Sequence, residues 1–270
     1  MESVVTDMPQ LVQDITALAE RAGQAVLDVY GQASPLDIVR KGDDSPITEA
    51  DRRSHAVIVA GLAQLTPDIP LVSEEDEGGE VTAARFWLVD PLDGTKEFIK
   101  RTGEFTVNIA LVEHGVPVMG VVHAPVLDAT WTGAPGQAHC RRGADTVALQ
   151  VQPPAVLEAL RVVASRDHAG PGVQAMLARL PGASTLCMGS SLKFCLVAEG
   201  RADLYYRDGP TMPWDTAAAH AVLAAAGGEV YAPDGAPLRY SAPRSLNPHF
   251  VAVGDVALPW SSLIAMGETS

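Results

Sequence analysis

The strongest constraint on this chain is an apolar segment that leads directly into two closely spaced aspartates. Residues 87–98 read WLVDPLDGTKEF, so the apolar residues 86–89 are followed by Asp90 and, one proline-containing step later, by Asp93. An apolar run of this kind is typical of a buried strand, and two carboxylates at its end would repel each other. We infer that a further group offsets the repulsion between these two carboxylates.

These residues allow a structural and a functional interpretation. A strand that ends in an Asp-Gly turn needs no function, because Asp93 can bond to its own backbone and Gly94 can adopt a positive φ. Alternatively, Pro91 stiffens the link and aims both carboxylates and the Leu92 carbonyl oxygen into one pocket. Such an oxygen-rich set suits a hard divalent cation, and magnesium fits it better than zinc.

Composition narrows the classes of protein. The 270 residues, 47% of them hydrophobic, can bury a full core in one large domain or in two that share an interface. The net charge of -14 argues against a nucleic-acid polymer as partner and favours capture of cations. We expect no signal peptide, and no segment reaches the roughly 18 apolar residues of a membrane span. The three cysteines lack CxxC spacing, which favours a reduced, cytoplasmic compartment over a zinc site or a disulfide framework.

The first half of the chain predicts helices packed on an antiparallel sheet. Apolar residues recur at helical spacing from Leu11 to Val29, and Gly31 follows where a helix would end. Thr48 and Asp51 have the spacing of a capping box before a second helix, which extends to about residue 65. Strands are expected at residues 70–73, 86–89, 106–112 and 116–123, with a hairpin turn at 113–115.

The second half predicts short strands that alternate with helices, an α/β pattern. Strands are expected at residues 160–164 and 202–206, and helices at 172–180, 191–199 and 215–226, the last closed by Gly227 and Gly228. Pro153 and Pro154 precede the change of pattern. We therefore expect an α+β domain of residues 1–154 that carries the metal loop and an α/β domain of residues 155–270.

Two further acidic positions stand beside apolar sequence. The run EEDE at residues 74–77 follows LVS at 71–73, although such a run is most often a solvated loop. Asp215 in MPWDTAAAH has the ordinary explanation of an N-cap for the Ala-rich helix. Together with the first motif, these carboxylates would suit a site for two or three metal ions between the domains.

Two segments could hold a phosphate group. The backbone N–H groups of Gly94 and Thr95 open the helical stretch TKEFIK, and GSS at 189–191 opens another. Plain helix capping is an alternative explanation for both segments. Anion-binding amides beside a metal cluster would suit phosphoryl transfer, and the natural inference is hydrolysis of a phosphate ester.

Together these motifs resemble a known family. Glu74-Glu75, DPLDGT at 90–95 and WD at 214–215 are similar to the lithium-sensitive, magnesium-dependent phosphatases that include inositol monophosphatase. Within this family, the chain looks like the CysQ branch, the 3'(2'),5'-bisphosphate nucleotidases. The segments that carry this likeness are DDSPITEAD, LVSEED, WLVDPLDGTKEFIKRTGEFTVNIALVE, GSSLKFCLVAEGRADLY and WDTAAAHAV. The likeness extends from about Lys41 to the region of Pro248.

The resemblance implies a layered αβαβα fold and Mg²⁺ as cofactor. It also implies hydrolysis of 3'-phosphoadenosine 5'-phosphate, a by-product of sulfate assimilation, to AMP and phosphate. The implied magnesium ligands are Glu74, Asp90, the Leu92 carbonyl oxygen, Asp93 and Asp215. The implied catalytic residues are Asp51 and Thr95, which would orient and activate water, and Glu74, with Glu75 a helper at most. The implied substrate contacts are Glu74, Leu92, Asp93, Gly94, Thr95, Ser190, Ser191, Lys193, Arg207 and Asp215.

One departure from the family pattern bears on the substrate. Inositol-specific members tend to carry a glutamate after the tyrosine pair that precedes the WD motif, whereas here Arg207 follows Tyr205 and Tyr206. A guanidinium pairs with phosphate and not with neutral hydroxyls, which favours a substrate with a second phosphate. Lys193 could serve the same end, although a solvated lysine on its helix explains it equally well.

Three functions follow from these patterns. The leading one is a magnesium-dependent nucleotide phosphatase; the second has the same chemistry on inositol phosphate or fructose bisphosphate. The third is a non-catalytic cation-binding protein, against which Thr95 and Asp51 argue. We expect a nucleotide bisphosphate as partner and a monomer or homodimer, with peripheral contact to the inner membrane left open. The histidines, among them His55, His123 and His220, are interpreted as core or surface residues and not as ligands.

Overall fold

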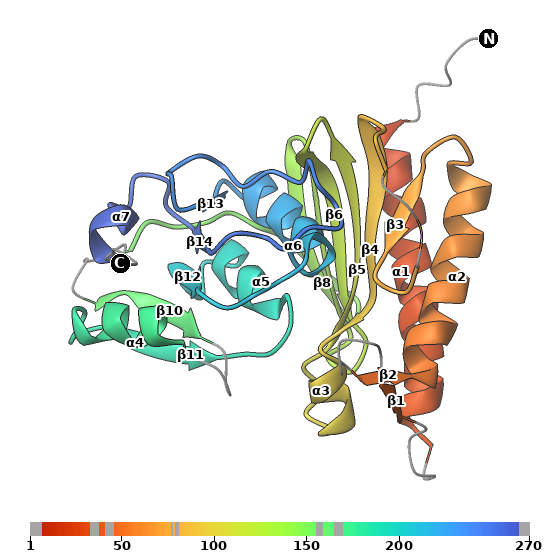
Figure 1. Cartoon of the computed structure of the whole chain (residues 1–270), viewed down its shortest axis with the longest axis horizontal. Coiled ribbons are helices and arrows are strands. Elements are labelled where there is room, and N and C mark those ends of the chain that lie inside the picture. The colour runs from red at the N-terminus through yellow and green to blue at the C-terminus, as the bar shows by residue number, and fades with distance from the viewer. Residues whose placement is uncertain are drawn as a thin grey trace.

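Layers of helix and sheet alternate along the long axis of the molecule (Figure 1). The computed structural model describes residues 7–32, 38–40, 46–76, 78, 81–154, 159–164 and 170–264. Helices α1 (Met8–Tyr30) and α2 (Glu49–Leu65) form one outer layer, and a short β1–β2 pair (Ile38–Arg40 and Pro46–Thr48) lies at one end of them (Figure 1). The αβαβα architecture implied by the resemblance is confirmed.

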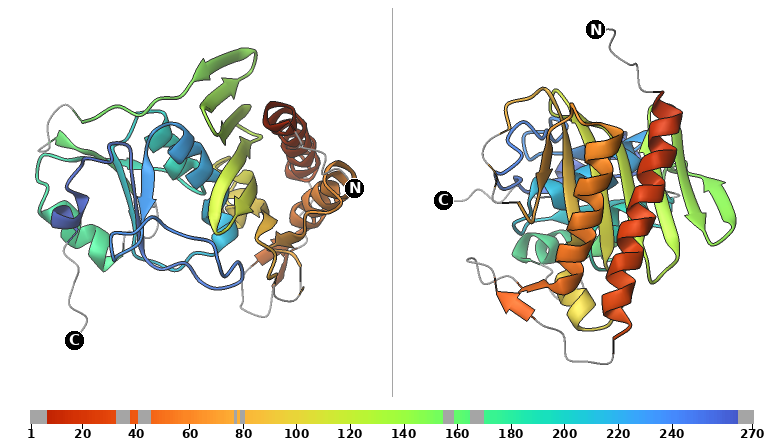
Figure 2. Two further views of the ribbon diagram at one scale, coloured as in Figure 1. Left: turned by 90° about the horizontal axis from the view of Figure 1, so that it is seen from above. Right: turned by 90° about the vertical axis from the view of Figure 1, so that its right-hand side faces the viewer.

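Helices α1 and α2 begin and end for local reasons. The apolar face of α1, which includes Ile15 and Leu18, is fully buried, and the Gly31 N–H donates to the Leu27 carbonyl at its end. The capping box is confirmed, since the Thr48 N–H donates to Asp51 Oδ2 at 2.8 Å. Both helices cover one face of the larger sheet, as the right-hand view of Figure 2 shows.

The larger sheet has seven strands in the order β3-β4-β5-β6-β7-β8-β9. The pairing of β3 with β4 is parallel, and the other pairings are antiparallel. The expected antiparallel sheet is therefore confirmed except at its β3 edge, and the hairpin at 113–115 is confirmed. The patterns did not predict its last three strands. The strands are β3 (Leu71–Ser73), β4 (Arg85–Asp93), β5 (Thr106–Glu113), β6 (Val116–Ala124), β7 (Ala129–Ala134), β8 (Gln137–Arg142) and β9 (Asp145–Ala148).

The smaller sheet has five strands in the order β11-β10-β12-β14-β13. Strands β11, β10 and β12 are parallel, and β14 pairs antiparallel with both β12 and β13. Two of the five, β10 and β12, were predicted from the sequence. The strands are β10 (Arg161–Ala164), β11 (Ser184–Cys187), β12 (Leu204–Arg207), β13 (Glu229–Tyr231) and β14 (Phe250–Val253).

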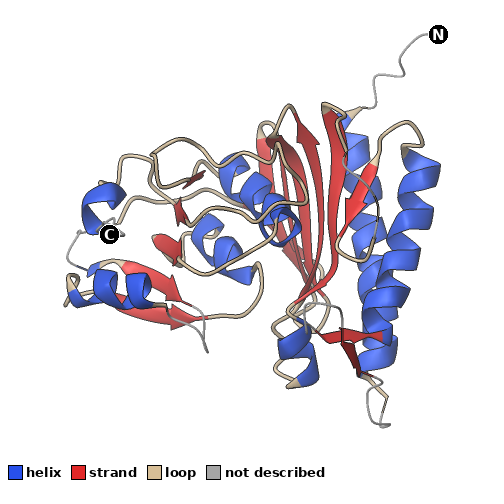
Figure 3. Ribbon diagram, in the orientation of Figure 1, coloured by secondary structure: helices blue, strands red, loops and turns tan. Residues whose placement is uncertain are grey.

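Helices α5 (Leu192–Ala198) and α6 (Pro213–Ala225) lie between the two sheets, while α4 (Pro171–Ala178) and α7 (Trp260–Leu263) cover the outer face of the smaller one (Figures 1 and 3). Helix α6 lies almost directly on the larger sheet. A Cβ atom on Gly120 of β6 would lie 2.1 Å from the Ala218 carbonyl oxygen. The two halves therefore share one core, and the boundary at residue 154 stays a prediction. None of the described helices is long and apolar enough to cross a membrane.

Substitution of Gly120 tests this close contact. Gly120→Ala is expected to lower the free energy of unfolding by about 3 kcal/mol, because the added carbon meets backbone that cannot move without shifting α6. Gly254→Ala is the matched control, since a Cβ atom there makes an ordinary contact of 3.6 Å with Val151. Equal stability of the two variants in denaturant unfolding would contradict the described packing of α6.

Candidate active site

The loop that carries Asp90 and Asp93 is an irregular end of β4. Pairing with β5 shifts register between these two residues, and the Leu92 N–H donates to Asp90 Oδ1 at 3.0 Å. Gly94 then adopts φ 92° before α3 (Thr95–Ile99), in the conformation expected of an Asp-Gly turn. A Cβ atom on Gly94 would also lie only 3.2 Å from the Glu104 carbonyl oxygen. The loop therefore requires glycine at this position.

Carboxylates from three separate elements converge at this loop. Burial, followed by the negative charges of Glu74, Asp93 and Asp215, raises the pKa of Asp90 well above its ordinary value. Burial, followed by the charge of Asp93, likewise raises the pKa of Asp215. Each group is therefore close enough to the others to oppose its ionisation. The end of β3, the end of β4 and the start of α6 thus meet at one acidic site.

The position of Asp215 differs from the N-cap explanation. Helix α6 begins at Pro213, so Asp215 is its third residue, and its Oδ2 accepts the Met212 N–H at 2.8 Å. Asp215 is therefore not the N-cap residue, which is Met212, although its carboxylate does cap the first turn. The carboxylate reaches back to the cap from inside the first turn, which places it beside Asp93.

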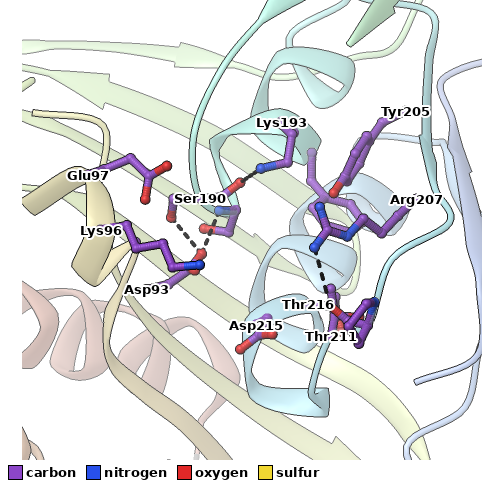
Figure 4. A pocket seen from close by; sticks show the side chains of 14 residues that line it. Asp93, Lys96, Glu97, Ser190, Lys193, Tyr205, Arg207, Thr211, Asp215 and Thr216 are labelled. Atoms are coloured by element: carbon purple, nitrogen blue, oxygen red, sulfur yellow. Dashed lines mark hydrogen bonds between the residues drawn. The ribbon is translucent and has the colours of Figure 1, made fainter. Parts of the chain in front are cut away.

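Asp93 is held by the opposite half of the chain. Its Oδ2 accepts hydrogen bonds from Ser190 Oγ at 2.5 Å and from the Ser191 N–H at 2.6 Å (Figure 4). The amide of Ser191, one of the expected phosphate donors, therefore has a carboxylate as its acceptor. Thr106 Oγ1 lies 2.7 Å from Ser190 Oγ, and Asn108 Oδ1 accepts from Ser191 Oγ at 2.9 Å.

Thr106 and Asn108 are site residues that were not predicted from the sequence. They are alternate residues of a strand that is otherwise apolar up to its end, so both face the same side of the sheet. Two polar residues at that spacing in a buried strand are a signal that could have found them.

Asp51 and Thr95 meet across the loop. Asp51 Oδ2 accepts both the N–H and the hydroxyl of Thr48, while the Thr95 hydroxyl lies 3.5 Å from Asp51 Oδ1 and 3.4 Å from the Leu92 carbonyl oxygen. Burial raises the pKa of Asp51 to about 6, although the hydrogen bonds from Thr48 oppose this. One oxygen of Asp51 is thus fixed by the capping box and the other faces Thr95.

A cavity of about 190 Å³ opens beside the acidic residues. Lys193 is only 7% exposed, and its Nζ donates to the Ser190 carbonyl at 2.5 Å and lies 5.5 Å from the centre of the Tyr205 ring (Figure 4). The alternative of a solvated lysine is therefore wrong. Burial lowers the pKa of Lys193 to about 8. The cavity is also lined by Lys96, Glu97 and Thr211, which were not predicted from the sequence.

Arg207 lies on the other wall of the cavity (Figure 4). Its Nη2 donates to the Pro210 carbonyl at 3.2 Å, whereas its buried Nε has no hydrogen-bond acceptor among the described residues. A buried donor without an acceptor is costly in a folded protein. Its place in a cavity wall is consistent with an acceptor supplied by a ligand.

The donor set at this site fits a hard divalent cation. Asp90, Asp93 and Asp215 each accept a backbone N–H through one oxygen, and a carboxylate has a second oxygen with which to bind an ion. Within the described ranges, no three acidic, histidine or cysteine side chains already stand at the spacing of ligands to one ion. Binding would therefore require small movements of these side chains. Of the acidic run, Glu74, Glu75 and Asp76 follow β3, and Glu77 lies outside the described residues.

The chain belongs to the inositol monophosphatase family, whose model matches residues 7–258. It is 51% identical over 247 residues to the 3'(2'),5'-bisphosphate nucleotidase CysQ of Escherichia coli K12, covering 89% of this chain and 98% of that protein. The crystal structure of CysQ from Bacteroides thetaiotaomicron is similar with a TM-score of 0.80 and 37% identity, over 94% of this chain and 100% of the other. The inositol monophosphatase of Anabaena has a TM-score of 0.75 and 26% identity, over 96% and 95% of the two chains.

Neutralising the Asp90 carboxylate is expected to affect activity and stability differently. Asp90→Asn retains an oxygen that can accept from the Leu92 N–H. It removes a negative charge that the neighbouring carboxylates repel. We expect phosphate-ester hydrolysis to fall by about a hundredfold or more. We expect the melting temperature of the chelator-treated protein at neutral pH to stay the same or to rise.

Asp203→Asn is the matched control, because Asp203 is equally buried but forms an ion pair with Arg161. This variant is expected to lose stability and to retain turnover. Retained turnover in Asp90→Asn, or a large loss of its stability, would contradict the assignment of Asp90 to the acidic site.

Proposed function

We propose that this chain is a Mg²⁺-dependent nucleotidase that hydrolyses the 3'-phosphate of 3'-phosphoadenosine 5'-phosphate to AMP and phosphate. The observation that carries the proposal is a cavity whose wall carries Lys193 and Arg207, directly beside a cluster of buried carboxylates. The identity of 51% to the CysQ nucleotidase of Escherichia coli K12 over most of both chains supports the same reaction. A substrate with two phosphates matches a site with two regions of phosphate-binding chemistry.

The acidic site would hold two or three magnesium ions. Their ligands would be Glu74, Asp90, the Leu92 carbonyl oxygen, Asp93 and Asp215. Bound magnesium supplies positive charge that stabilises phosphate oxygens and makes water more acidic. The hydrogen bonds from Ser191 and Met212 orient two of these carboxylates before any ion binds.

Asp51 and Thr95 would orient the attacking water. The Thr95 hydroxyl would accept a hydrogen bond from the water while it donates to Asp51 Oδ1, which lies 3.5 Å away. A carboxyl group with a pKa near 6 is mostly ionised at neutral pH and can accept a proton through this threonine. The amides of Gly94 and Thr95 would donate to the scissile phosphate.

Arg207 and Lys193 would select the second phosphate. The unpaired Nε of Arg207 can donate to a phosphate oxygen, and Lys193, held by the Ser190 carbonyl, adds positive charge to the same cavity. An inositol monophosphate has no second phosphate and would offer only neutral hydroxyls to this wall. A cytoplasmic location and the choice between monomer and homodimer stay predictions.

Phosphate release with magnesium from 3'-phosphoadenosine 5'-phosphate, inositol 1-phosphate and fructose 1,6-bisphosphate tests the proposal. The nucleotide is expected to be the preferred substrate. Equal rates on all three substrates would contradict the proposed specificity, and no release from any of them would favour a non-catalytic cation-binding protein.

Arg207→Ala tests the role of the second phosphate. We expect it to reduce the preference for 3'-phosphoadenosine 5'-phosphate over 3'-AMP by about 10- to 100-fold, since only the first substrate carries a 5'-phosphate. Arg201→Ala is the control, because Arg201 is exposed and pairs with Glu199. An unchanged preference in Arg207→Ala would remove Arg207 from the specificity site.

A further inference from the structure

One face of α2 contacts three segments of the acidic site. Asp51, Ser54 and His55 have the spacing at which helical side chains share a face. Asp51 faces Thr95, and Ser54 Oγ donates to the Pro91 carbonyl at 2.7 Å. The third residue, His55, was interpreted from the sequence as a core or surface histidine without a role in the site. Its contacts give it one.

His55 bridges both ends of the turn that carries Glu74. This acidic turn comprises residues 73–76. His55 Nδ1 lies 3.0 Å from Ser73 Oγ, and its Nε2 lies 3.4 Å from Asp76 Oδ1. With a proton on Nε2, the ring can donate to the Asp76 carboxylate and accept from the Ser73 hydroxyl through Nδ1. The Ser73 oxygen in turn accepts the Glu75 N–H at 3.4 Å.

The acidic turn is also fixed from two other directions. The Glu74 N–H donates to the Val89 carbonyl of β4 at 3.1 Å, one residue before Asp90. Arg244, from the second half of the chain, donates through Nη1 to the Asp76 carbonyl at 2.9 Å. His55 supplies the side-chain contacts to this turn from the helix that also carries Asp51. His55 therefore contacts the acidic turn on both sides of Glu74.

Ser73, His55 and Asp76 together contain the groups of a serine-hydrolase triad. Ser73, however, is fully buried at 0% exposure, so no substrate can reach its hydroxyl. A nucleophilic role is therefore excluded, and the same contacts instead hold the turn in one conformation.

We propose that His55 is a positioning residue, which orients the acidic turn through Ser73 and Asp76 so that Glu74 can bind a divalent cation together with Asp90. This inference rests on the proposed function, because it assumes a cation at that site. Residues that orient a ligand without touching the ion reduce the freedom that the ligand loses on binding. Loss of the imidazole is therefore expected to weaken cation binding even when the fold is intact.

The test is calorimetric titration of the substrate-free, full-length protein with magnesium chloride alone. His55→Ala is expected to weaken Mg²⁺ binding by about tenfold. His55→Gln, whose amide supplies both an acceptor and a donor, is expected to recover most of the affinity. Ser73→Ala removes the same contact from its other side and provides the test if the alanine variant at position 55 does not fold.

His123→Ala is the matched control. His123 is buried, whereas His55 is half-buried, and it too contacts a hydroxyl, that of Thr130 at 2.9 Å. It lies on β6 and contacts no residue of the acidic turn in the described structure. We expect this variant to bind Mg²⁺ like the wild type. The concentration of magnesium needed for half-maximal phosphate release should shift in parallel with the calorimetric affinity in all variants.

Unchanged Mg²⁺ affinity in His55→Ala or Ser73→Ala would overturn the inference, as would an equal loss in His123→Ala. A glutamine variant as weak as the alanine variant would also overturn it. Absence of Mg²⁺ binding or of phosphate release in the wild-type protein would instead contradict the proposed function itself.

Discussion

The repulsion between buried carboxylates is the constraint on which the rest of this structure depends. Burial and neighbouring negative charge both oppose the ionisation of Asp90 and Asp215. Without compensating charge, a fold would gain stability by separating these groups. The chain instead anchors them with backbone N–H donors at Leu92, Ser191 and Met212. This arrangement is consistent with a cation site, because a bound cation would relieve the repulsion between the carboxylates.

The acidic site depends on both halves of the chain being packed together. Asp93 comes from the first half and is held by Ser190 and Ser191 of the second. Asp215 comes from the second half, on a helix that lies against the larger sheet at Gly120. The same contact that builds the middle layer of the fold therefore places the carboxylates within reach of one another, and a boundary at residue 154 would divide the site.

The sequence predicted the features that depend on local interactions. Helix α1, the Thr48–Asp51 capping box and the 113–115 hairpin follow from periodicity, capping and turn chemistry within a few residues. The short strands β7 to β9, β11, β13 and β14 were not predicted, because they are three to six residues long and gain their stability from neighbouring strands.

The candidate site shows the same division between local and long-range interactions. Acidic motifs identified Glu74, Asp90, Asp93 and Asp215, since charged residues beside apolar sequence are informative on their own. Most hydrogen-bond partners of Thr106, Asn108 and His55 are distant in sequence, up to 85 residues away. The alternate polar positions of Thr106 and Asn108 mark that strand as unusual, but they do not show which segments it meets. The N-cap of α6 is Met212, three residues before Asp215, so Asp215 caps the helix from within its first turn.

The most direct test of this account is a crystal structure grown with Mn²⁺ in place of Mg²⁺ and measured at the manganese absorption edge. We predict anomalous density peaks between the carboxylates of Glu74, Asp90, Asp93 and Asp215, with oxygen ligands at each peak. Manganese bound elsewhere while these four side chains point apart into solvent, with no peak between them, would contradict it.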